Sequence, residues 1–134
     1  MVMLAKPSVA IGFGLFFLCA VACTHSDEML SSPLSVVPDW AAGFVLVAAA
    51  LVNRPSYVAG RTYQVAAWAF MVSLLFGSFV GNFEEWRSTT SEGHRGLVSL
   101  EQGSYLASIG VMCLLAVGGL IASVRTATGS AALR

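Results

Sequence analysis

Hydrophobic residues occur in four long segments that polar intervals separate. The apolar segments cover about 7–24, 36–52, 62–81 and 104–124, and the polar intervals cover 25–35, 53–61 and 82–103. A helix needs about 20 apolar residues to cross a hydrocarbon core of ~30 Å, and each segment comes near that length. The pattern therefore predicts a single membrane domain over residues 1–134, an all-α integral membrane protein built as an antiparallel bundle of four transmembrane helices.

The third apolar segment carries a small residue at every fourth position. These residues are Ala69, Ser73, Gly77 and Gly81. Residues four apart lie near one face of an α-helix. In lipid, small residues that let two backbones approach closely hold helices together. We therefore expect this small-residue strip to be a helix-packing site, against another helix of the chain or of a partner.

The first apolar segment admits two interpretations. Residues 1–24 fit a signal peptide, with Cys23 at a position that resembles a lipoprotein processing site. The residue three positions before Cys23 is Ala20 rather than leucine, which favours a retained first span. In that span Ala10 and Gly14 form a second four-residue pair of small side chains that is available for packing.

Residues near the ends of the other spans predict how those helices begin. Before the second span Ser35 is a candidate N-cap, Pro38 falls in the first turn, and Asp39 stands where a helix N-terminus favours negative charge. Near the start of the third span, Tyr63 and Trp68 fit the belt of aromatic residues at a membrane interface.

Charge is distributed unevenly, although the formal net charge is zero. Seven acids and two arginines, Arg87 and Arg95, lie in or beside the first and third polar intervals. The acids are Asp27, Glu28, Asp39, Glu84, Glu85, Glu92 and Glu101, and the basic residues elsewhere are Lys6, Arg54, Arg61, Arg125 and Arg134. The positive-inside rule then predicts that both termini and the middle interval are cytoplasmic. The outer face carries a net charge of −5, which favours a basic partner over nucleic acid.

The interiors of the predicted spans contain no charged residue, since Asp39 is at the start of the second. Because charged groups inside a bilayer mark ion paths and proton relays, their absence disfavours a proton-coupled transporter or pump. His25 and His94 both lie in polar intervals, so no span offers a histidine to haem. Cys19, Cys23 and Cys113 form no CxxC motif and are expected to be unpaired. We expect no cofactor, no bound metal and no enzymatic activity.

The third polar interval combines acidic residues with a histidine. Metal ligands could come from Glu84, Glu85, Glu92, His94 and Glu101 together with His25 and Asp27. No ligand pair has a recognised spacing, so a solvated acidic loop is the favoured interpretation. Within this interval Glu84, Glu85, Trp86 and Arg87 place both signs of charge beside an aromatic residue, which is typical of a partner-docking site. An ordinary membrane-interface cap is an equal alternative.

The composition, with 57% hydrophobic and 10% charged residues, is far from the quarter of charged residues usual in soluble domains. The leading expectation is a non-catalytic small multipass membrane protein, an accessory or assembly subunit of a larger membrane protein complex. Its partners would be other membrane subunits and lipids, in a bacterial cytoplasmic membrane. One alternative is a small transporter or channel acting as a homo-oligomer, with a pore formed by Ser73, Ser78 and Asn82. Another is a membrane enzyme that uses Glu85 and His94.

Overall fold

The computed structural model describes residues 6–25, 33–53, 58–91 and 97–131, and this part of the chain is helical with no strand. The helices are α1 (Pro7–Thr24), α3 (Pro33–Val52), α4 (Val58–Ser91) and α5 (Leu97–Ala131). The prediction of an all-α chain with four helices is confirmed. Three helical segments are long and apolar enough to cross a membrane, namely Pro7–Thr24, Ala59–Ser88 and Gln102–Gly129, whereas the apolar part of α3, Val36–Val52, is shorter.

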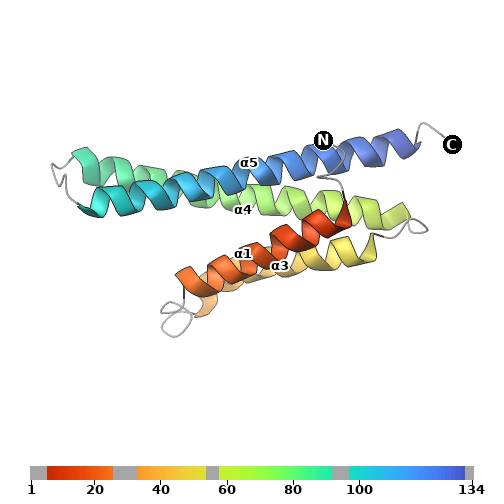
Figure 1. Ribbon diagram of the computed structural model, residues 1–134, viewed down its shortest axis with the longest axis horizontal. Coiled ribbons are helices and arrows are strands. Elements are labelled where there is room, and N and C mark those ends of the chain that lie inside the picture. Colours follow the sequence, from red (N-terminus) through yellow and green to blue (C-terminus); the bar gives the residue numbers. More distant parts are fainter. Residues whose placement is uncertain (1–5, 26–32, 54–57, 92–96, 132–134) are drawn as a thin grey trace.

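The helices associate as two pairs. α1 packs along α3 and α4 packs along α5, while α3 also contacts α4. In Figure 1 the two pairs lie close together at the end where α3 stops and α4 begins, and they diverge toward the opposite end. This divergence sets up the cleft described in the next section.

Trp68 of α4 lies at the centre of the region where the pairs meet. Only 1% of the residue is exposed, and its ring centroid is 5.2 Å from that of Phe13 in α1. On the other side, a Cβ added to Gly119 of α5 would lie 2.7 Å from two ring carbons of Trp68. The ring therefore fills a space that α5 leaves open only because residue 119 is glycine. The expectation that Trp68 belongs to the interfacial aromatic belt is wrong, although Tyr63 is exposed.

Small residues also mediate the contact between α1 and α3. Ala10 is fully buried, and a Cβ on Gly14 would lie 2.8 Å from the side chain of Val47 and 3.2 Å from the carbonyl oxygen of Gly43. The prediction that Ala10 and Gly14 form a packing pair is confirmed. The two backbones approach closely here because neither Gly14 nor Gly43 has a side chain.

The corner between α3 and α4 combines a close backbone contact with a buried amide. A Cβ on Gly60 would lie 2.7 Å from the carbonyl oxygen of Val52 and 2.8 Å from the Cα of Asn53. The amide of Asn53 donates a hydrogen bond to Oε1 of Gln64, which is 1% exposed. The Gln64 Nε2 has no partner among the described residues. This hydrogen bond links the end of α3 to the second turn of α4.

The start of α3 differs from the prediction. The helix begins at Pro33, so Pro38 lies inside it and the first turn contains no acidic residue. Asp39 is therefore in the second turn, where the favourable interaction with the helix N-terminus has weakened. Proline has no backbone N–H, so the earlier start leaves the carbonyl of Leu34 without its usual helical donor. The side chain of Ser35 is outside the described part of the structure.

The third polar interval is also more helical than the sequence predicts. α4 has 34 residues and continues through Ser91, and α5 has 35 residues and begins at Leu97. The interval 82–103, predicted as an outer loop, is therefore helical over 82–91 and 97–103. The small and polar residues between 88 and 91 do not end α4.

The cysteines are free, as predicted. Cys19 and Cys23 are exposed on α1, and Cys113 is half-buried on α5.

Candidate functional site

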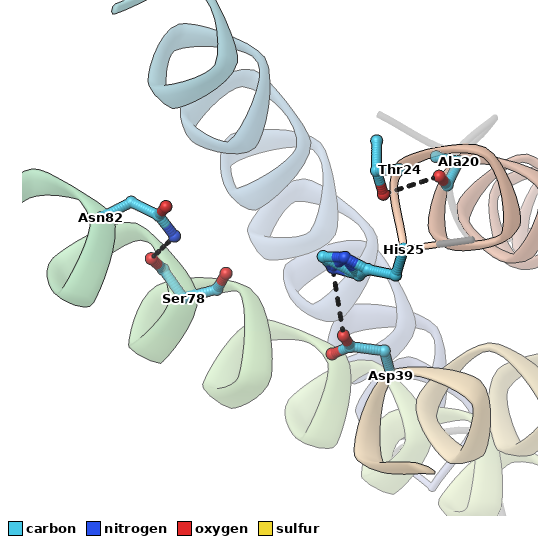
Figure 2. A network of polar contacts seen from close by, with 6 residues as sticks. All are labelled: Ala20, Thr24, His25, Asp39, Ser78 and Asn82. Carbon is cyan, nitrogen blue, oxygen red and sulfur yellow. Dashed lines mark hydrogen bonds and ion pairs between the residues drawn. The ribbon is translucent and has the colours of Figure 1, made fainter. Parts of the chain in front are cut away.

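A cleft opens between the two helix pairs where they diverge. Its polar side is formed first by the end of α1, where the backbone N–H of His25 donates to the carbonyl of Val21 at 3.0 Å and so closes the helix. The His25 side chain points toward Asp39 of α3, with 3.9 Å between Nε2 and Oδ2 (Figure 2). The contact is an ion pair when the imidazole is protonated, and it is too long for a direct hydrogen bond.

The opposite polar side is formed by α4 and α5. Ser78 and Asn82 lie one turn apart on α4 and face the end of α1 in Figure 2. Tyr105 and Ser108 of α5 line the same space. The polar residues that line the cleft thus come from all four helical segments. Among them, only Thr24 and His25 are neighbours in the sequence.

Several polar side chains in the cleft already donate their protons to their own helices. Thr24 Oγ1 donates to the carbonyl of Ala20 at 2.9 Å, Ser108 Oγ to that of Ser104 at 2.9 Å, and Asn82 Nδ2 to that of Ser78 at 2.7 Å. The hydroxyl oxygens keep acceptor lone pairs, and Asn82 keeps Oδ1 and its second N–H. These groups therefore present hydrogen-bond acceptors to the cleft.

The deeper part of the cleft is apolar. A cavity of about 250 Å³ is lined mainly by hydrocarbon, with the side chains of Phe17, Val21, Leu75, Ile109 and Met112 among its walls. It continues into an outer cavity of about 550 Å³ that is bordered by Thr24, His25, Ser78, Asn82 and Tyr105. An apolar interior with a few polar groups at one end is the usual form of a small-molecule site.

The small-residue strip faces outward. Ala69, Ser73, Gly77 and Gly81 are all exposed, and a Cβ on either glycine would meet nothing within 4 Å. The inward face of α4 instead carries Gln64, Ala67, Trp68, Met71 and Leu75. The strip does not pack within the described part of the chain, and its packing against a partner stays a prediction.

The residues of the predicted docking site have two environments. Glu84, Glu85 and Arg87 are exposed, whereas Trp86 is half-buried. The Trp86 ring lies 6.0 Å from that of Phe83, and its Nε1 is 3.9 Å from where a Cβ of Gly103 would be. The three charged side chains are therefore accessible to a partner, while the aromatic ring packs toward α5. Docking itself stays a prediction.

The structure also separates the residues of the two alternative sites. Ser78 and Asn82 border the cleft, whereas Ser73 is exposed, so the three do not share one pore-lining surface. Within residues 6–25, 33–53, 58–91 and 97–131 there is no group of three or more His, Cys, Asp or Glu side chains that could hold a metal ion. Asp27, Glu92 and His94 are outside the described residues, as is the side chain of Glu101.

The sequence carries a signal for one part of the cleft only. His25 follows the first span and Asp39 opens the second, and a short connection between adjacent helices brings such positions together. The sequence gives no comparable signal for Ser78, Asn82 and Tyr105, because their approach to α1 depends on the angle between the two helix pairs.

No protein-family model, curated protein or solved structure matches this chain.

Proposed function

We propose that this chain is a multipass protein of a bacterial cytoplasmic membrane and a non-catalytic accessory or assembly subunit of a larger membrane protein complex. In this proposal the four helices form an antiparallel transmembrane bundle with both termini in the cytoplasm. The excess of basic residues at the two chain ends and at the start of α4, against acids at the opposite helix ends, supports that orientation.

The observation that carries the proposal is the outward orientation of the small-residue strip. Ala69, Ser73, Gly77 and Gly81 are exposed on α4 although Ala10 and Gly14 of α1 are buried. A strip of small side chains allows the close backbone approach that stabilises helix pairs in lipid. Large apolar side chains that are also exposed, Phe70 and Phe76, lie beside it and would form the borders of such a contact.

The exposed charges at the end of the same helix extend this surface. Glu84, Glu85 and Arg87 follow the strip on α4 and are accessible. Polar side chains at the margin of an interface contribute to partner selection more than to affinity. We therefore assign helix packing to the strip and docking outside the membrane to these residues and Trp86.

Replacing Gly77 with leucine tests this assignment. The new side chain would project from the strip without meeting another described residue, because none lies within 4 Å of the Cβ position. We expect the variant to fold and to lose its membrane partners when the tagged protein, at native expression level, is purified in mild detergent and analysed by sizing and mass spectrometry.

Gly12→Leu is the matched control, since a Cβ at Gly12 also meets nothing within 4 Å but lies on α1. The control should retain the same partners in the same ratio as wild type. Retention of stoichiometric partners by Gly77→Leu would contradict the assignment. Purification of wild type as a homo-oligomer alone would instead favour the transporter or channel.

A further inference from the structure

The cleft between the helix pairs has the two-part form of a site for an amphiphile. Its inner cavity of about 250 Å³ is walled largely by aliphatic and aromatic side chains, and its outer part is bordered by His25, Ser78, Asn82 and Tyr105 with Thr24. Small-molecule sites commonly measure roughly 300–1,000 Å³, so the inner cavity suits one hydrocarbon chain better than two. The polar residues where the two cavities meet would then hold the head group.

The polar atoms of the cleft include several hydrogen-bond acceptors for a head group. Thr24 and Ser108 direct their hydroxyl protons to carbonyl groups of their own helices, and Asn82 directs its Nδ2 to the carbonyl of Ser78. The two hydroxyl oxygens keep acceptor lone pairs, and Asn82 keeps Oδ1 together with its second N–H. A head group with its own N–H donors, or with a positive charge, complements these oxygens.

The charges favour a cation. Asp39 is the one acidic side chain among the described residues lining the inner cavity, and no lysine or arginine is among those lining either cavity. Tyr105 lines both cavities and can place a ring face against a cation.

We infer that this cleft binds an amphiphile with a cationic ammonium head and one hydrocarbon tail. The ammonium group lies at the polar end of the inner cavity beside Asp39, Ser78 and Tyr105, and the tail occupies the apolar part beside Phe17 and Ile109. The inference is independent of the accessory function, because the small-residue strip and the cleft are on different surfaces of α4.

The test is direct binding of radiolabelled dodecyltrimethylammonium to the full-length tagged protein, immobilised on scintillation-proximity beads in uncharged maltoside micelles. We expect saturable binding that unlabelled probe displaces. Dodecanol has the same tail without the charge, and tetramethylammonium has the charged head without the tail. Each should displace the probe at least tenfold more weakly than the unlabelled probe, a difference of about 1.4 kcal/mol.

Asp39→Asn removes the charge in the cleft with little change in shape, and we expect it to weaken binding at least tenfold. Glu84→Gln is the matched control, because it removes an equal charge from an exposed position on α4, and it should bind within twofold of wild type. Ser108→Phe should also abolish binding, since this exposed residue borders the inner cavity and a ring there fills it. Unchanged sizing profiles and circular dichroism show that the variants fold.

Each alternative explanation of probe binding predicts a different result in this experiment. Equal losses for Asp39→Asn and Glu84→Gln would mean that only the surface charge attracts the probe, and would overturn the inference. Displacement by dodecanol as strong as that by unlabelled probe would show an apolar groove without preference for a cation. An anionic head group would depend on the His25 imidazole, whereas a cationic one does not. We therefore expect His25→Gln to bind the probe at least as tightly as wild type does. Loss of binding in this variant would also overturn the inference.

Discussion

Replacing Trp68 with alanine is expected to lower the free energy of unfolding by about 3–5 kcal/mol, the range for removal of a buried large aromatic side chain. Trp68 is 1% exposed and fills the space between Phe13 of α1 and Gly119 of α5. Its removal leaves a cavity where three helices meet. Unfolding in mixed micelles with increasing denaturing detergent, followed by circular dichroism, measures the change.

Two further variants separate this packing effect from a general effect of losing an aromatic ring. Trp86→Ala removes a half-buried tryptophan from the far end of α4 and should cost less than half as much. Gly119→Leu adds a side chain against the ring, so Gly119→Leu combined with Trp68→Ala should be less destabilised than the sum of the two single changes. Additive losses would show that Gly119 and Trp68 do not share one space.

Gly60→Val is the second change with a large expected effect, a loss of about 3 kcal/mol, at the upper end of the usual cost of overpacking. The new Cβ would lie 2.7 Å from the carbonyl oxygen of Val52 and 2.8 Å from the Cα of Asn53. Both atoms belong to the backbone, so no side-chain rotation relieves the contact. The start of α4 must move away from the end of α3, and the hydrogen bond from Asn53 to Gln64 would be lost with it.

The matched control for this change is Gly81→Val, which introduces the same β-branched side chain into the same helix where nothing lies within 4 Å. The unfolding titration used for Trp68 applies to both variants. The difference between them removes the intrinsic cost of valine in a helix and isolates the contact. Equal stabilities would contradict a close approach of α3 and α4 at Gly60.

The sequence predicts the helices well because long apolar runs are typical of membrane-spanning helices. It does not predict which side of a helix faces a neighbour. Four-residue spacing occurs at Ala10 and Gly14, which are buried, and equally at Gly77 and Gly81, which are exposed. The spacing defines a strip of the helix surface, but only the position of a second helix decides whether the strip is covered.

Trp68 and the cleft show which structural information the local sequence pattern does not contain. A tryptophan near the end of an apolar segment normally belongs at the interface, and its burial here depends on Gly119, which is 51 residues away in the sequence. The approach of Ser78 and Tyr105 to His25 depends in the same way on the angle between the two pairs of helices. Such long-range relations leave no periodic signal in one chain.

The length of α4 restricts how the protein can sit in a lipid bilayer. A helix of 34 residues is about 51 Å long at a rise of 1.5 Å per residue. Even at a tilt of about 40° it covers about 39 Å along the bilayer normal, which exceeds a hydrocarbon core of ~30 Å. The end that carries Glu84, Glu85 and Arg87 is the end that charge directs into water. In the proposed transmembrane orientation, the last turns of α4 and the first turns of α5 therefore extend beyond the hydrocarbon core. They hold these charges on the aqueous side of the membrane, within reach of proteins that never enter it.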